Sequence, residues 1–155
     1  VVSLGFRFLV FISYVITKCG GTTDYDVDIY YSAVKGETFV CPIAKGTLMD
    51  MMYMPDALNA AISLMEADPE KLVHRNAFNI ASMSFDPEAI YEAIRKHVPD
   101  FKMIYQVDPL KQRIADSWPD SLDDTCAREE WGWKPAYDLE SMTVDMLEKL
   151  RAKLK

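Results

Sequence analysis

The first sixteen residues form an almost continuous apolar run rich in Val, Ile, Phe and Tyr. The run is shorter than the roughly 20 apolar residues that a membrane-spanning helix needs. It also lacks the basic start and small-residue cleavage site of a secretory signal. Apolar, β-branched residues without polar alternation are typical of a strand buried on both faces, as in a parallel sheet covered by helices. We therefore predict a buried strand within residues 1–16.

Apolar positions recur with helical spacing in three segments between residues 24 and 97. The first predicted helix follows Asp24 and ends at Gly36, because glycine favours the left-handed conformation that terminates helices. A second begins at Pro55, a residue suited to the first helical turn. A third covers residues 86–97. One side of the second helix is predicted to carry the apolar residues Leu58, Ala61, Ile62 and Met65.

The remaining segments alternate between short strands and helices. Strands are predicted at 38–42, 51–53, 76–81 and 101–107, and further helices at 108–116, 124–131 and from 138 onward. Helices outweigh strands after residue 24. The pattern predicts an α/β fold in which a small α+β lobe is attached to one strand of a larger sheet.

Residues 20–25 read Gly-Gly-Thr-Thr-Asp-Tyr and lead directly into the first predicted helix. Flexible backbone, two hydroxyls and the N–H groups of a helix start suit the binding of a small anion such as a carboxylate. The same residues also suit a plain turn in which Thr23 caps the helix. The residues alone leave both interpretations open.

The charge and cysteine content limit the possible partners. A net charge of −7 without a basic patch argues against nucleic acid, whose phosphates require clustered Lys and Arg. The three cysteines, Cys19, Cys41 and Cys126, are odd in number and lack metal-ligand spacing. They indicate reduced thiols in an intracellular protein. His74 and His97 are far apart in the sequence and are expected at the surface, so no metal site is predicted.

Two dehydrogenase motifs were tested. No Gly-x-Gly-x-x-Gly turn occurs, so the chain lacks the usual means of holding the pyrophosphate of NAD. Tyr14 and Lys18 have the spacing of a catalytic Tyr–Lys pair, but that pair needs a helix and this segment is strand-like. No catalytic residue is assigned. Trp118, between polar residues and a proline, is equally compatible with a pocket wall and a core plug.

An ordered set of motifs resembles the C-terminal half of L-threonine 3-dehydrogenase, of the extended short-chain type related to nucleotide-sugar epimerases. The resemblance covers about residues 20–155. Its motifs are GGTTDY (20–25), MMY (51–53), AFNIASMSF (77–85), VDP (107–109), IADSWP (114–119) and AREEWGWKP (127–135).

The resemblance implies an enzyme that oxidises threonine to 2-amino-3-ketobutyrate with NAD held by an N-terminal Rossmann half, and a homodimer when intact. Its catalytic Ser/Thr, Tyr and Lys lie in the half that this chain does not carry. By analogy, Gly21, Thr22, Thr23 and Trp118 lie beside the L-threonine substrate. Residues 1–19 would be a Rossmann strand and linker, and residues 20–155 the substrate-binding lobe. NAD is not expected to bind this chain alone.

Two other functions remain open: a fragment acting on a nucleotide sugar, and a non-catalytic ligand-binding or remnant module. The chain begins with Val1 on an apolar run, as an interior fragment does, and is expected to be inactive alone. No membrane partner is expected. The expected location is the cytoplasm, or the mitochondrial matrix in an animal.

Overall fold

The computed structural model describes residues 4–8, 10–15, 24–74 and 77–155. The helices in these ranges are α1 (Tyr25–Lys35), α2 (Met54–Glu66), α3 (Pro87–Arg95), α4 (Pro109–Ala115), α5 (Thr125–Trp131) and α6 (Leu139–Lys153). The strands are β1 (Phe6–Arg7), β2 (Val10–Ile12), β3 (Phe39–Cys41), β4 (Met49–Tyr53), β5 (Phe78–Asn79), β6 (Met83–Phe85) and β7 (Met103–Tyr105). No helix in these ranges is long and apolar enough to cross a membrane.

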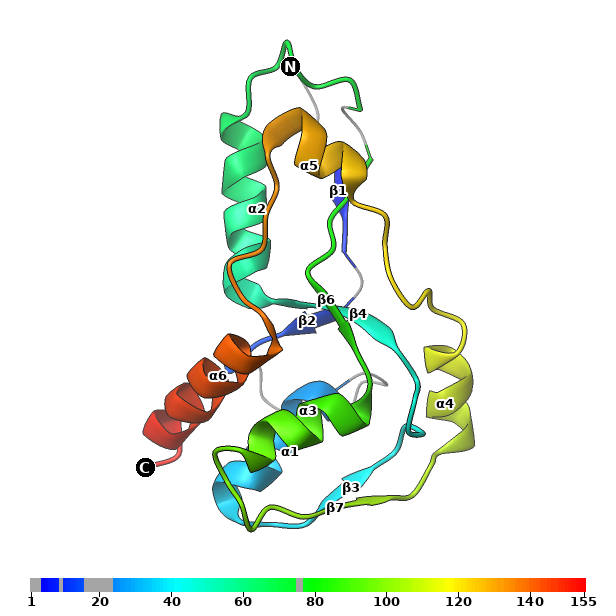
Figure 1. Ribbon diagram of the computed structural model, residues 1–155, viewed down its shortest axis with the longest axis vertical. Helices are drawn as coiled ribbons and strands as arrows, with labels where there is room; N and C mark the ends of the chain where they lie inside the picture. Colours follow the sequence, from blue (N-terminus) through cyan, green and yellow to red (C-terminus); the bar gives the residue numbers. More distant parts are fainter. Residues whose placement is uncertain (1–3, 9, 16–23, 75–76) are drawn as a thin grey trace.

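A three-stranded sheet lies in the middle of the molecule. Its order is β2-β4-β6, with β4 parallel to β2 and antiparallel to β6. Two parallel pairs, β1-β5 and β3-β7, complete the strands of the described residues. Figure 1 shows α2, α5 and β1 at one end of the molecule, and α1, α3, β3 and β7 at the other. The predicted α/β fold class is confirmed.

Strand β4 separates two hydrophobic clusters. Met49, Met51 and Tyr53 contribute to the first cluster, and Met52 contributes to the second. This alternation follows from the period of two in a strand, whose successive side chains point to opposite faces. All five residues of β4 are buried, so the short strand predicted at residues 51–53 is confirmed and begins two residues earlier.

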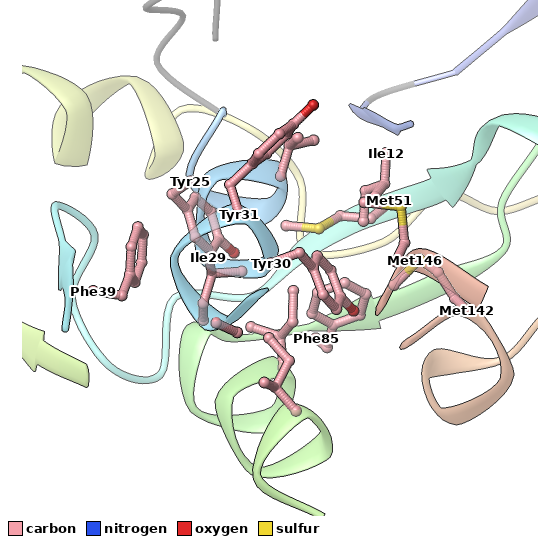
Figure 2. Packing of buried hydrophobic residues seen from close by; sticks show 14 of the residues in the cluster. Ile12, Tyr25, Ile29, Tyr30, Tyr31, Phe39, Met51, Phe85, Met142 and Met146 are labelled. Carbon is pink, nitrogen blue, oxygen red and sulfur yellow. The ribbon is translucent and has the colours of Figure 1, made fainter. Parts of the chain in front are cut away.

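The first cluster joins β2, α1, β3, β4, α3 and α6. Figure 2 shows Tyr30 of α1 pointing toward Phe85 and the side of α6. Its hydroxyl lies 2.8 Å from the hydroxyl of Thr143 on α6, and both side chains are fully buried. Ile12 belongs to this cluster as well. The domain boundary between residues 19 and 20 stays a prediction, since residues 16–23 are outside the described ranges.

The predicted helix ends are confirmed where a side chain or glycine defines them. Asp86 accepts a hydrogen bond from Ala89 N, and Asp138 forms a reciprocal capping box with Ser141. Gly36 and Gly132 end α1 and α5 in the left-handed conformation. Such positions favour glycine because any Cβ is strained at positive φ.

The single long strand predicted within residues 1–16 is wrong. The described part of this run forms two short strands, β1 and β2, which pair with different partners, β5 and β4. Arg7 and Phe11 are exposed in these strands, so the run is not buried on both faces. Continuous apolarity did not reveal that the two strands belong to different sheets.

The predicted apolar side of α2 does not face the core. Leu58, Ile62 and Met65 are 58%, 49% and 71% exposed. The helix instead packs through the neighbouring face, which carries Ala57, Ala60 and Leu64. Because α2 is apolar on both faces, its periodicity could not indicate which one meets the core. We call Leu58, Ala61, Ile62 and Met65 the exposed α2 face.

Candidate functional site

The predicted substrate loop lies outside the described residues. Gly21, Thr22 and Thr23, together with Lys18 of the rejected Tyr–Lys pair, belong to the range 16–23. Their place beside the substrate therefore stays a prediction. The structure does place both flanks of this range. Tyr14 and Val15 precede it, and α1 follows it.

Lys153 of α6 holds the two flanks together. Its Nζ donates hydrogen bonds to the backbone oxygens of Tyr14 (3.0 Å) and Val15 (3.2 Å). It also donates to the hydroxyl of Tyr31 on α1 (3.1 Å) and lies 5.8 Å from the centre of that ring. The segment before the predicted loop and the middle of α1 are therefore tied to the same amine. Sequence alone could not indicate this role, since Lys153 is one of several basic residues at the end of α6.

Trp118 lies just after α4, in a turn closed by a hydrogen bond from its backbone N–H to Ala115 O (3.1 Å). Its side chain is half-buried and packs against the first hydrophobic cluster. Tyr25, at the start of α1, belongs to the same cluster. The core thus connects Trp118 with the end of the predicted loop. A half-buried ring is consistent with both earlier interpretations, a pocket wall and a core plug.

Three strands hold the segment that carries Trp118. Asp50 Oδ2 in β4 accepts a hydrogen bond from Leu122 N (3.0 Å). The Ser84 hydroxyl in β6 donates to Asp120 O (2.5 Å), and the Asn79 amide in β5 donates to Asp123 O (3.2 Å). We call residues 116–124 the Trp118 segment. These positioning residues were missed at the sequence level, although an aspartate inside the apolar strand Met-Asp-Met-Met-Tyr was a possible signal.

Asp50 is the buried acid of this region. Burial raises the pKa of its carboxyl to about 6, the hydrogen bond from Leu122 N opposes the shift, and the negative charge of Asp124 adds to it. The side chain is 3% exposed. Because the unfolded carboxyl titrates near pH 4, the folded state binds more protons between roughly pH 4 and pH 6. Folding stability therefore falls as the pH rises through this window.

We expect Asp50→Asn to remove this dependence. An asparagine oxygen can still accept the hydrogen bond from Leu122 N, but it does not titrate. We compare the free energies of unfolding of the wild type and the variant. The difference, wild type minus variant, should fall by up to about 3 kcal/mol between pH 4 and pH 7. Urea unfolding at several pH values measures the difference. Parallel pH profiles for the two proteins would contradict the burial of an ionisable Asp50.

A second buried acid lies in the first turn of α1. Asp26 is 1% exposed, and its Oδ2 has no hydrogen-bond partner among the described residues. Burial raises its pKa well above the ordinary range of an aspartate, although hydrogen bonds from backbone N–H groups oppose the shift. A carboxyl in this position favours its neutral form. The first turn of the helix that follows the predicted loop therefore carries a buried carboxyl with a raised pKa.

The described residues do not fit the pyrophosphate of NAD. Strand β4 passes directly into α2 through Tyr53 and Met54, without the glycines that let backbone approach phosphate. The described glycines with positive φ are Gly36, Gly46 and Gly132. Two of these end helices, and Gly46 lies in the turn before β4. No step of a reaction is therefore assigned to NAD on this chain.

No protein-family model matches the chain. An uncharacterized epimerase/dehydratase of Staphylococcus saprophyticus is 54% identical over 149 residues, which are 96% of this chain and 47% of the relative. The chain thus spans about half the length of this curated relative. Its identity is high enough that the two matched segments share a fold.

Solved structures are also similar to the chain. The X-ray structure of an L-threonine dehydrogenase from Clostridium difficile has a TM-score of 0.94 and 58% identity, and the match covers 97% of this chain and 47% of that one. UDP-glucose 4-epimerase of Thermotoga maritima has a TM-score of 0.74 at 19% identity, over 97% of this chain and 46% of that one. The second likeness shows the fold alone. Both matches cover about half of the longer proteins.

Proposed function

We propose that this chain, which matches the C-terminal half of the extended short-chain L-threonine 3-dehydrogenases, supplies the threonine-binding half of such an enzyme. The observation that carries the proposal is the 58% identity to the Clostridium difficile L-threonine dehydrogenase across nearly the whole chain. At this identity, side chains that line a site tend to be shared as well as the fold. The 19% identity to the epimerase gives no comparable support for a nucleotide-sugar substrate.

In this proposal the chain binds and orients threonine, and the other half carries NAD and the catalytic groups. The hydroxyls of Thr22 and Thr23 and the backbone N–H of Gly21 would hold the substrate carboxylate near the start of α1. Trp118 would cover the pocket and exclude water. Three hydrogen bonds hold the Trp118 segment, and Lys153 bonds to the residues that flank the predicted loop. Together these bonds would fix the loop and the Trp118 segment on opposite sides of the substrate.

Two surfaces support docking of a missing half. The exposed α2 face presents four apolar side chains to solvent, three of them about half exposed or more. The nearby pair β1-β5 is parallel, and each strand has one neighbour among the described residues. Parallel strands usually lie inside larger sheets covered on both faces. A Rossmann half would add strands to this pair and cover the α2 face.

Reconstitution tests the function directly. The purified chain is mixed with the separately expressed N-terminal half of the Clostridium difficile enzyme. Threonine-dependent formation of NADH is expected in the mixture and in neither half alone. A mixture in which both halves are folded and associated, yet threonine yields no NADH, would exclude the proposal. The homodimer, the cytoplasmic location and the inactivity of the isolated chain stay predictions.

The exposed α2 face gives a prediction about association. Ile62→Glu combined with Met65→Glu should weaken binding of the N-terminal half at least about tenfold, because buried glutamates lose hydration without a partner. The stability of the isolated chain should change little, since both side chains are exposed. Val144→Glu is the matched control, as Val144 is an exposed apolar residue of a different helix, α6. Calorimetric titration measures the binding, and equal losses in both variants would contradict the assignment.

The alternatives are separated by a ligand panel. Threonine, UDP-glucose and buffer alone are compared by thermal shift, using the reconstituted pair. Stabilisation by UDP-glucose and not by threonine would favour the nucleotide-sugar alternative. A pair that forms but responds to neither ligand would favour a non-catalytic module.

A further inference from the structure

His74, Cys126 and Glu130 meet at a place that the proposed function does not use. One ligand atom from each residue, a ring nitrogen of His74, the Cys126 Sγ and a Glu130 carboxylate oxygen, lies within 4.8 Å of the other two. Cys126 and Glu130 are one turn apart on α5, so both project from the same side of that helix. His74 comes from the loop between α2 and β5. Residues more than 50 positions apart thus converge.

The carboxylate of Glu130 is already held in place. Its Oε2 accepts hydrogen bonds from the backbone N–H groups of Val73 (2.7 Å) and His74 (3.0 Å). Its Oε1 instead accepts from the His74 ring at Nδ1. The backbone therefore fixes one oxygen and directs the other toward the imidazole. Metal sites commonly orient their carboxylate ligands by such additional hydrogen bonds.

We propose that His74, Cys126 and Glu130 form a binding site for a zinc-like divalent ion. Thiolate, imidazole and carboxylate together are the donor set that Zn²⁺ prefers, and three protein ligands leave a fourth position for water. A tetrahedral ion with bonds of about 2.0–2.3 Å needs ligand atoms roughly 3.3–3.8 Å apart. Separations of at most 4.8 Å reach this range with small side-chain movements, and the hydrogen-bonded His74 Nδ1 and Glu130 Oε1 move apart to admit the ion.

The surroundings suit an ion that enters from solvent. The side chain of His74 is 56% exposed, whereas that of Glu130 is 11% exposed. Cys126 is half-buried against the second hydrophobic cluster. Binding would release the thiol proton of Cys126 to solvent, and the imidazole proton would stay on the ring nitrogen that does not bind the ion. The two anionic ligands then neutralise the ion, and the loop that carries His74 becomes fixed to α5.

Cobalt provides the test, because Co²⁺ replaces Zn²⁺ in tetrahedral sites and reports a thiolate ligand by its near-ultraviolet charge-transfer band. The full chain, reduced and metal-free, is titrated with Co²⁺ and then with Zn²⁺. We expect one equivalent of Co²⁺ to produce the band and Zn²⁺ to abolish it. Absence of the band, or stoichiometric cobalt binding without it, would overturn the proposal.

Variants locate the site. Cys126→Ala should remove the band and weaken Zn²⁺ binding at least about 100-fold. This loss exceeds the one expected when a residue that only supports a metal ligand is replaced. His74→Ala, at an exposed loop position, should weaken binding to a similar extent without risk to the core. Zn²⁺ should also slow alkylation of Cys126 in the wild type, but not in His74→Ala. Unchanged zinc affinity in His74→Ala would exclude the site even if Cys126→Ala failed to fold.

Two controls have matched chemistry. His97 forms an exposed pair with Glu140, with 2.9 Å between His97 Nε2 and Glu140 Oε1. Neither residue belongs to the candidate metal cluster. His97→Gln should leave zinc affinity and the cobalt band unchanged. Cys19→Ala should leave the band unchanged as well. Loss of the band in either control would place the ion elsewhere.

Discussion

Asp56→Ala is expected to lower the free energy of unfolding by about 3–4 kcal/mol, which corresponds to a drop of roughly 10 °C in Tm for a chain of this size. Asp56 lies in the first turn of α2 and is 1% exposed. Its Oδ1 accepts a hydrogen bond from Ala136 N (2.9 Å), and its Oδ2 accepts one from Tyr137 N (3.1 Å). Alanine would leave both N–H groups without their acceptor.

The effect is large because these two bonds join distant parts of the chain. Residues 136–137 lead into α6 through its cap at Asp138, and α6 supplies much of the first hydrophobic cluster. Hydrogen bonds to a charged acceptor contribute more than neutral ones, and unpaired buried donors add a desolvation cost. Losing Asp56 should therefore loosen α2 and the entry to α6 together.

Urea unfolding of the isolated chain measures this change. Asp56→Asn keeps one acceptor oxygen and should show about half of the loss. Glu66→Ala serves as the control, because it removes an exposed acid from the other end of α2 and should change stability by no more than about 0.5 kcal/mol. Similar losses for the Asp56→Ala and Glu66→Ala variants would refute the structural role of Asp56.

Trp118→Ala is expected to lower kcat/KM for threonine about 10- to 100-fold in the reconstituted enzyme, mainly through a higher KM. This prediction rests on the proposed function. The indole would cover the bound amino acid, and its loss would admit water and remove apolar contact. Trp118→Phe keeps a flat ring and should retain most of the activity.

A structural role must be distinguished from a substrate role, because Trp118 also packs against the first cluster. Stability and kinetics are therefore measured on the same variants. A role as a core plug predicts lower stability with normal kinetics at temperatures where the variant is folded. A role as a pocket wall predicts a raised KM under those conditions. The first outcome would remove Trp118 from the proposed site.

Part of the candidate site could be predicted from the sequence. The Asp116-Ser117-Trp118-Pro119 motif directed attention to Trp118, which the structure places on the cluster that includes Tyr25 at the start of α1. The residues that position the Trp118 segment were not predicted. Asp50 bonds to Leu122, 72 positions away, and Ser84 bonds to Asp120, 36 positions away. Hydrogen bonds between residues so far apart produce no periodic pattern in the sequence, so they could not be predicted from it.

The helices and most of their ends could be predicted from local sequence patterns. A capping aspartate such as Asp86 or Asp138 and a terminating glycine such as Gly36 act within about four residues, so their effects are visible in local order. The ordered motifs likewise point to the proteins to which the chain is similar. Both the helix caps and the motifs are local in sequence, so they can be recognised without knowing which distant residues are in contact.

Only the tertiary structure decided which surfaces meet. It divided the first apolar run between two sheets, and it buried one apolar face of α2 while leaving the other exposed. It also brought His74 to Cys126 and Glu130, although cysteine spacing had predicted no metal site. The physical reason is common to all three. The type of a residue shows whether its side chain can make an apolar contact or bind a metal. Its partner depends on packing between segments that are far apart in sequence.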